Sequence, residues 1–212
     1  MLCQTKNLSI DLNKIKILND ITVNIKFGKT TAIVGKNGSG KSTLLKCIYF
    51  LIKPSWGLIK HMFKYPFPML FQRPIILDNT IKFKFVVVTI IKKIQPMMNW
   101  YNAFQLDKIR NKKIYQTSGG EQQKTFLSRI MSTDPEVIIM DEPNQNLDSL
   151  SEKILINLIN QERKKNKTIV ITTHDIKIVK KIADEIILLD RGKLIYNGSL
   201  KSFLIEESRF DE

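Results

Sequence analysis

The amino-acid sequence predicts an α/β fold, in which helices cover both faces of a parallel sheet and a separate antiparallel layer precedes it. Two observations carry this prediction. After residue 30, short β-branched and aliphatic runs alternate with amphipathic helical segments, which is typical of a parallel sheet. Before residue 30, apolar residues recur at every second position, as in Leu8, Ile10 and Leu12, which is the periodicity of strands.

The individual elements follow in order from the same patterns. The β-branched run at 30–34 predicts a buried strand, and residues 42–51 predict a helix after a glycine-rich loop. Residues 81–104 fit neither period cleanly, and a helix is the favoured interpretation. The remaining predicted elements are helices at 121–132, 151–165 and 176–182 and strands at 137–140, 168–172 and 185–189.

Composition limits the classes of protein that the chain can belong to. It has 212 residues and a formal net charge of +14. That charge favours an anionic partner such as nucleic acid, a membrane surface or phosphate, although lysine spread along the whole chain equally fits a solvated basic surface. A hydrophobic fraction of 43% excludes wholesale disorder.

The sequence also bears on the compartment. No apolar run reaches the roughly 18 residues of a spanning helix. The start MLCQTKNLSI lacks a leader pattern, and two cysteines do not suggest a disulfide framework. We expect one domain in a reducing cytosol.

A glycine-rich loop between the strand at 30–34 and the next helix predicts a phosphate site. It reads GKNGSGKST and fits the pattern G-x-x-x-x-G-K-[ST] of P-loop NTPases, whose parallel sheet is RecA-like. Glycines let backbone N–H groups surround phosphate oxygens, the lysine bridges phosphates, and the hydroxyl ligates Mg²⁺. The expected ATP-binding residues are Gly35, Lys36, Asn37, Gly38, Ser39, Gly40, Lys41, Ser42 and Thr43.

Two carboxylates follow the buried strand at 137–140. A parallel strand delivers Asp141 to the carboxyl edge of the sheet, where ligands bind in open α/β folds. Asp141 is the expected partner of Mg²⁺, together with Ser42. Glu142, one residue on, can face an attacking water as general base.

A third segment, TSGGEQQ at 117–123, completes a set of motifs that resembles one family. The chain is similar to the ATP-binding subunits of ATP-binding-cassette (ABC) transporters, whose signature reads LSGGQ or LSGGE. Ser118, Gly119 and Gly120 match it, and we expect them to form an anion nest before a helix that starts near Glu121. The resemblance implies that two cassettes pack head to tail and that each signature caps the ATP held by the other.

The resemblance assigns further residues in chain order. Gln72 in MLFQRP matches a glutamine that reaches Mg²⁺ and the attacking water, and His174 in ITTHD matches a histidine that contacts the γ-phosphate. Asp148 matches the family's D-loop. Leu12 takes the place of the aromatic residue that stacks on adenine, which weakens that contact by about a kcal/mol.

The resemblance also implies the domain organisation. Residues 1–212 form a single ABC ATPase domain with a helical subdomain inserted at about 73–132. The spacing between Lys41 and Gln72 is short for the family, so the hairpin around residues 57–67 is expected to be abridged. The D-loop reads Gln145-Asn146-Leu147-Asp148, where a small Ser-Ala pair is common.

The function implied is an ATPase that powers a transporter from the cytoplasmic face of the cell membrane. Its expected partners are a second, identical cassette, polytopic permease subunits and a solute-binding protein. FQRPIILDNT and SGGEQQ resemble importers of small solutes, with an oxyanion such as tungstate or phosphate as one candidate.

Two other function classes compete with this interpretation. A soluble ABC ATPase acting on nucleic acid or ribosomes fits the net charge. In such a protein, basic residues are expected to interleave with aromatic ones, and the basic residues of this sequence show no such cluster. We therefore expect no nucleic-acid partner. A P-loop kinase shares the phosphate loop but does not explain TSGGEQQ or the Asp141-Glu142 pair.

Overall fold

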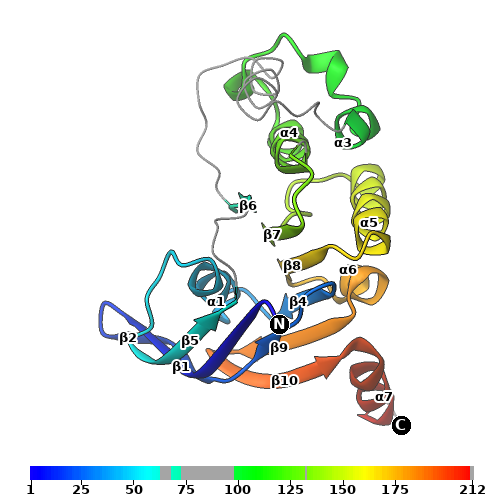
Figure 1. Cartoon of the computed structure of the whole chain (residues 1–212). Helices are drawn as coiled ribbons and strands as arrows, with labels where there is room; N and C mark the ends of the chain where they lie inside the picture. Colours follow the sequence, from blue (N-terminus) through cyan, green and yellow to red (C-terminus); the bar gives the residue numbers. More distant parts are fainter. Residues whose placement is uncertain (63–67, 73–97, 132, 211–212) are drawn as a thin grey trace.

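The computed structural model describes residues 1–62, 68–72, 98–131 and 133–210, and within them two sheets stand against each other. The larger sheet lies in the middle of the molecule and the smaller one beside it, with helix α1 (Lys41–Ile48) between them (Figure 1). Helices α4 (Gly119–Met131), α5 (Ser149–Lys164) and α6 (Ile176–Ile182) lie on the other side of the larger sheet. The predicted fold class, a parallel sheet with an antiparallel layer, is confirmed.

The larger sheet has six strands in the order β10-β9-β4-β8-β7-β6. All neighbours are parallel except β10 and β9, which are antiparallel. The strands are β4 (Thr30–Val34), β6 (Met69–Leu70), β7 (Val137–Asp141), β8 (Thr168–Thr173), β9 (Glu185–Asp190) and β10 (Lys193–Ser199). The carboxyl ends of β4, β7 and β8 therefore meet at one edge, where the candidate ligand site lies.

The antiparallel layer is built around β1. Its strands are β1 (Cys3–Leu12), β2 (Ile15–Ile21), β3 (Asn24–Ile25) and β5 (Trp56–His61). Strand β1 pairs with β2 along its second half and with β5 and β3 along its first half. A Cβ on Gly57 would lie 2.2 Å from the carbonyl oxygen of Asn7, so only glycine allows β5 to cross so close to β1.

Most helices pack on the two faces of the larger sheet, whereas α3 (Met98–Ala103) packs on α4 (Figure 1). The helices are α1 (Lys41–Ile48), α3 (Met98–Ala103), α4 (Gly119–Met131), α5 (Ser149–Lys164), α6 (Ile176–Ile182) and α7 (Leu200–Phe210), with short 3-10 turns η1 (Leu106–Ile109) and η2 (Ile114–Gln116). Of the helices in the described ranges, none combines the length and the apolar character that crossing a bilayer requires.

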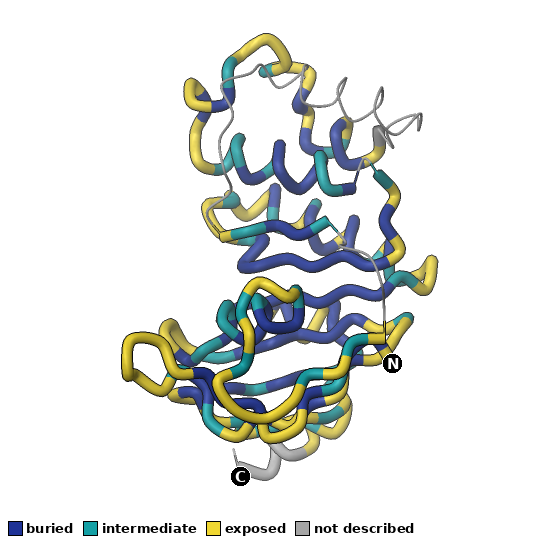
Figure 2. Tube along the Cα trace, turned by 60° about the vertical axis from the view of Figure 1, so that its left-hand side comes forward, coloured by how far each residue is buried: buried dark blue, intermediate teal, exposed yellow. Residues whose placement is uncertain are grey.

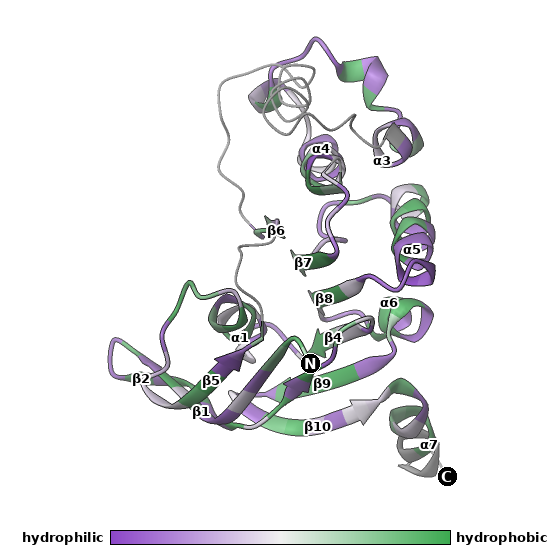
Figure 3. Cartoon of the chain, viewed as in Figure 1, coloured by the Kyte–Doolittle hydropathy of each residue, from purple (hydrophilic) through white to green (hydrophobic). Residues whose placement is uncertain are grey.

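Two hydrophobic cores lie on opposite faces of the larger sheet, because successive side chains of a strand alternate sides. On β4, Ile33 joins the core that contains α1 and the antiparallel layer. Its neighbours Ala32 and Val34 join the core that contains α4, α5 and α6. The five strands of the parallel sheet are accordingly buried almost throughout (Figure 2) and strongly apolar (Figure 3).

Several predicted boundaries shift by a few residues. The helix expected at 42–51 ends at Ile48, and Phe50 just beyond it has a φ of +65°, a left-handed conformation that does not continue a helix. Strand β10 and helix α7 have no counterpart among the predicted elements. Helix α3 falls within the segment 81–104, whose first part lies outside the described residues, as does the end of the hairpin at 57–67.

Candidate functional site

The phosphate loop connects the carboxyl end of β4 to helix α1. Gly35 has a φ of +154°, and a Cβ there would lie 2.3 Å from the carbonyl oxygen of Leu189. Gly40 has a φ of +101°, and a Cβ there would lie 2.5 Å from Leu18 in β2. Both positions therefore require glycine, for backbone conformation and for space.

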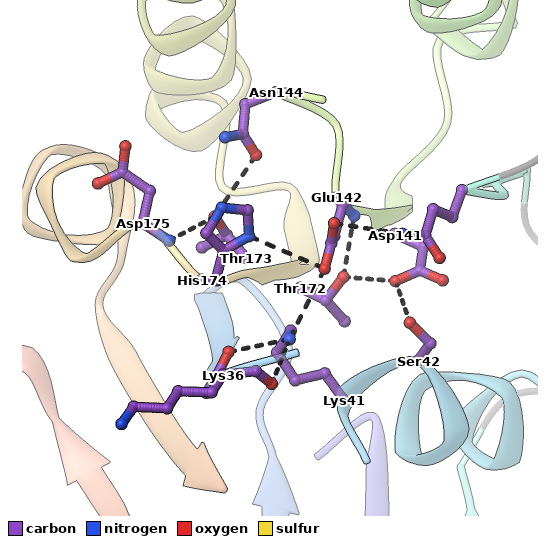
Figure 4. A network of polar contacts seen from close by, with 12 residues as sticks. Lys36, Lys41, Ser42, Asp141, Glu142, Asn144, Thr172, Thr173, His174 and Asp175 are labelled. Carbon is purple, nitrogen blue, oxygen red and sulfur yellow. Dashed lines mark hydrogen bonds and ion pairs between the residues drawn. The ribbon is translucent and has the colours of Figure 1, made fainter. Parts of the chain in front are cut away.

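Lys41 is the first residue of α1, and its side chain is buried beneath the loop. Its ammonium nitrogen Nζ donates to the carbonyl oxygens of Gly35 (2.9 Å) and Lys36 (3.1 Å). It also lies 3.6 Å from Oε1 of Glu142. The Lys36 side chain is exposed and extends away from this cluster (Figure 4). The cation of Lys41 is thus held at the centre of the loop.

Ser42 and Asp141 lie side by side, although 99 residues separate them in the sequence. The Ser42 hydroxyl donates to Oδ1 of Asp141 at 2.9 Å. Asp141 ends strand β7 and is almost completely buried. The hydroxyl and the carboxylate predicted to share a metal ion are therefore adjacent.

Glu142 is the point at which the predicted catalytic side chains converge. Its Oε2 accepts a hydrogen bond from Nε2 of Gln72 at 3.3 Å, and its Oε1 lies 4.0 Å from Nδ1 of His174. Lys41 approaches the same carboxylate from below (Figure 4). Glu142 also has a φ of +46°, a left-handed conformation that is unfavourable for any residue with a Cβ.

A pocket of about 300 Å³ lies over the loop. It is lined by residues of the phosphate loop, by Gln72 and Glu142 but not His174 among the three predicted catalytic residues, and by Ile17. The loop residues that line it are Asn37, Gly38, Gly40, Lys41, Ser42 and Thr43. Ser39 is buried beside it and donates its N–H to the carbonyl of Lys36.

Leu12 is not among the residues that line this pocket. It lies at the end of β1 with 43% of its surface exposed, and the apolar wall next to the loop is Ile17 instead. The only sequence feature that pointed to Ile17 is its place in the alternating pattern of the predicted strand.

The signature segment differs from the prediction in its local structure. Helix α4 begins at Gly119, two residues before the predicted start. The Ser118 hydroxyl accepts from the N–H of Glu121 (3.2 Å), and the Glu121 carboxylate accepts from the N–H of Ser118 (2.8 Å). This reciprocal capping box draws the glycines into the first helical turn, so the expected nest is replaced by a helix N-terminus.

Asp148 caps the following helix. Its carboxylate accepts from the N–H of Ser151 at 2.8 Å and from Nζ of Lys124 at 3.3 Å. The hydrogen bonds from Ser151, together with Lys124, lower the pKa of this carboxyl to about 2. Neither Asp148 nor Ser118, Gly119 and Gly120 is among the residues that line the pocket over the phosphate loop.

One buried residue that the sequence interpretation passed over connects these segments. Gln123 of α4 donates through Nε2 to the carbonyl oxygens of Pro143 (2.9 Å) and Glu142 (3.5 Å). Its side chain therefore joins the signature helix to the turn after the predicted base. The motif TSGGEQQ contains Gln123, but nothing in the motif indicates which way the side chain points.

The arrangement of these groups defines a class of protein. A glycine-rich anion loop, a buried lysine, a hydroxyl beside a carboxylate and a second carboxylate within reach of a histidine are the groups that a nucleotide-hydrolysing ATPase needs. They lie at the carboxyl edge of a parallel sheet, as such sites do.

Comparison with known proteins identifies the family. The family model described as "ABC transporter" matches residues 18–145. The zinc import ATP-binding protein ZnuC of Wigglesworthia glossinidia brevipalpis is 38% identical over 202 residues, which cover 92% of this chain and 86% of that protein. The chain therefore belongs to the ABC transporter family, as its ATP-binding and ATP-hydrolysing subunit.

Solved structures agree with this assignment. MJ0796, a bacterial ABC transporter cassette solved as a dimer, has a TM-score of 0.78 and 26% identity over 94% of this chain and 99% of that one. CbiO1 from Clostridium perfringens, part of the transporter complex cbiONQ, has a TM-score of 0.76 and 26% identity over 97% and 91%. The ABC cassette fold is thus shared over nearly the whole chain.

Proposed function

We propose that the pocket over the phosphate loop binds MgATP and that Glu142 is the general base for its hydrolysis. The observation that carries the proposal is the convergence on one carboxylate of Lys41, Gln72 and His174, which come from three distant segments. The ammonium of Lys41, the amide of Gln72 and the imidazole of His174 surround the Glu142 carboxylate and hold it in place at the wall of the pocket.

The phosphate chain of ATP would lie on the loop. The N–H groups of residues 35–43 and the N-terminus of α1 favour anions there, and Lys41 supplies a full positive charge. In the structure this ammonium group donates to two neutral backbone carbonyls and lies 3.6 Å from the Glu142 carboxylate. A phosphate oxygen is a stronger acceptor than a carbonyl for this ammonium, because it is itself negatively charged, so that both donor and acceptor carry charge.

The residues present fit a magnesium ion. Within the described part of the chain, no group of three or more His, Cys, Asp or Glu side chains is placed to hold a metal ion. Mg²⁺ instead uses one or two carboxylates, hydroxyls, waters and substrate phosphates. Ser42, Asp141 and Gln72 would hold the ion. When bound, Mg²⁺ neutralises charge on the transferred phosphoryl group.

Glu142 would take the proton from a water that attacks the γ-phosphate. His174 lies on the far side of the same carboxylate with 55% of its side chain exposed, so it can contact the γ-phosphate as well as Glu142. Gln72 would orient the water through its amide. Each contact holds the base in one orientation, and positioning of this kind contributes to phosphoryl transfer together with electrostatic stabilisation.

Ser118, Gly119, Gly120 and Asp148 would serve the ATP of a partner cassette. They do not line the pocket of their own chain, and the N-terminus of α4 is suited to an anion. The dimeric structure of MJ0796 supports a second copy of this chain as the partner. Two ATP molecules would then lie between two cassettes.

The assignment of Glu142 is tested with Glu142→Gln. The amide keeps the shape and the hydrogen bond to Gln72 but accepts no proton, so turnover should fall by roughly 10²- to 10⁴-fold while ATP still binds. Size-exclusion chromatography with MgATP should show a dimer of the variant that persists because ATP is not cleaved. Turnover at the wild-type rate would remove Glu142 as the base.

Glu136→Gln is the matched control. Glu136 precedes the same strand at its opposite end, its side chain is exposed, and only its backbone carbonyl is used in the sheet. The same loss of charge there should leave turnover unchanged.

We propose that the chain works at the cytoplasmic face of the membrane with polytopic permease subunits. Exposed apolar side chains of Phe50, Leu51 and Met62 gather where α1 and β5 end, and the ring of Phe50 stacks on His61. Phe71, next to Gln72, packs edge-on against Tyr49 at the same end of α1. A permease segment docked here would lie next to Phe71, so its movement would be passed to the adjacent Gln72. We also propose that residues of about 73–132 form a helical subdomain inserted in the single ABC ATPase domain.

The proposed transport direction is import, and the proposed solute is a divalent metal ion, zinc first. The support is ZnuC, a named zinc importer subunit at 38% identity over most of both chains. ZnuC points to a metal ion rather than to the tungstate- or phosphate-like solute considered from the sequence. A solute-binding protein on the outer side of the membrane would then deliver the ion to the permease subunits.

Uptake assays in cells distinguish these solutes. Cells that depend on this chain should accumulate less zinc when they carry Glu142→Gln, with tungstate and phosphate uptake unchanged, as measured by elemental analysis. Loss of tungstate or phosphate uptake with normal zinc uptake would instead favour an oxyanion as the solute. Purification of the wild-type chain with RNA rather than with a membrane protein would favour the nucleic-acid alternative.

A further inference from the structure

The hydroxyl of Thr172 lies between the two carboxylate residues of the site. Thr172 is on β8, directly opposite Asp141 on β7 in the parallel register, and it is completely buried. Its Oγ1 donates to Oδ1 of Asp141 at 2.6 Å and accepts from the backbone N–H of Glu142 at 2.9 Å. Figure 4 shows this single oxygen between both groups.

These two contacts act on different parts of the site. The bond to Asp141 fixes the orientation of the carboxylate that also accepts from Ser42, so the two proposed metal ligands are held in register. The bond from the N–H of Glu142 holds the backbone at that residue, which has a φ of +46° although its side chain has a Cβ. Such a conformation is less favourable by about 1–2 kcal/mol and persists only when its surroundings hold it.

We propose that Thr172 is a positioning residue for ATP hydrolysis, whose hydroxyl sets the Asp141 carboxylate and the backbone turn that aims Glu142. Valine at this position would keep the shape and the strand, because Thr and Val are both β-branched. It would remove the hydroxyl that the Asp141 oxygen and the Glu142 N–H share, leaving Ser42 as the partner of the first and the Thr172 carbonyl (3.2 Å) as the partner of the second. The proposal rests on the proposed function, because it assumes that Asp141 and Glu142 do the chemistry.

The test compares Thr172→Val with Thr172→Ser. Valine should lower kcat by about ten-fold or more, because the base and the metal ligand are both misplaced. The KM for ATP should change less than about three-fold, since the phosphate loop is untouched. Serine keeps the hydroxyl and should restore kcat to within about three-fold of wild type.

A second readout does not depend on turnover. Binding of Mn²⁺ in place of magnesium, followed by electron paramagnetic resonance with a non-hydrolysable ATP analogue, should be weaker by about three-fold or more in Thr172→Val. It should be near wild type in Thr172→Ser. The affinity for the analogue without metal should be unchanged in both.

Thr31→Val is the matched control. Thr31 is a buried threonine on β4, the neighbouring strand, and its hydroxyl has no hydrogen-bond partner within the described structure. The same chemical change there should leave kcat and Mn²⁺ binding unchanged, which separates the hydroxyl's role from the general effect of valine in this sheet.

Two outcomes would overturn the inference. One is kcat and Mn²⁺ binding of Thr172→Val within two-fold of wild type. The other is a serine variant as impaired as the valine variant, which would assign the effect to packing. Failure of the proposed function is distinct, since it would show as wild-type protein without turnover or as an active Glu142→Gln.

Discussion

Lys41 shows at the residue scale how a short motif becomes a site. Its pattern in the sequence predicts a phosphate ligand, and the structure places its ammonium group beneath the loop, nearly completely buried. The 3.6 Å approach to Glu142 was not foreseeable from either motif alone. It arises because β4 and β7 end at the same edge of the sheet.

Lys41→Ala should weaken ATP binding by roughly 10- to 100-fold, because a hydrogen bond to a charged group contributes about 1.5–3 kcal/mol. Titration with a fluorescent ATP analogue measures this. Lys36→Ala is the control, since that side chain is exposed and only its carbonyl contacts Lys41. Equal affinities of the two variants would contradict the phosphate-loop assignment.

At the scale of elements, the signature helix α4 and the turn after β7 form one packed unit. Gln123 donates to the carbonyls of Pro143 and Glu142, and the backbone of Asn146 lies against Gly120. A movement of α4 would therefore reach the backbone of the proposed base through two contacts. The predicted helix at 121–132 was nearly right in extent, yet this joint with residues 142–146 depends on long-range packing.

Gly120→Ala should lower the free energy of unfolding by about 1–3 kcal/mol, since its Cβ would lie 2.7 Å from the carbonyl oxygen of Asn146. At Gly119 the nearest atom is 3.4 Å away and belongs to the flexible Asn146 side chain. Gly119→Ala should therefore be neutral or slightly stabilising, because alanine favours helices. Thermal unfolding followed by circular dichroism measures both, and equal melting temperatures would show that α4 does not pack as described.

At the scale of the whole molecule, two sheets are joined through one apolar core. Cys3 of β1 and Cys47 of α1 are both free and both lie in this core. Burial raises the pKa of each thiol to about 12, and the neighbouring Cys47 adds to the effect at Cys3. Both thiols are therefore protonated and inaccessible at neutral pH.

A thiol reagent at pH 8 should consequently react slowly with the native protein and rapidly with both cysteines in urea. The midpoint of the increase in labelling should coincide with the loss of circular dichroism, because exposing either thiol requires the layers to separate. Cys3→Ser and Cys47→Ser assign the signal to each position. Fast labelling of one thiol before unfolding would mean that the antiparallel layer detaches independently.

Local sequence was enough for those features that depend on neighbouring residues. The strand at 30–34, the phosphate loop and the Asp141-Glu142 pair are encoded by runs of adjacent residues, because backbone conformation and strand burial respond to local side chains. The family resemblance extended this to Gln72 and His174, and the structure brings both to Glu142.

Other features were decided only by tertiary structure, because they depend on atoms from distant segments meeting at one point. The hydroxyl of Thr172 lies between Asp141 and Glu142, the amide of Gln123 reaches the turn after β7, and Ile17 lines the pocket. All three placements follow from strand order and register. The sequence by itself determined which chemical groups are present and in which local elements. The three-dimensional arrangement decided which of them touch, since contact free energy depends on positions that no linear pattern specifies.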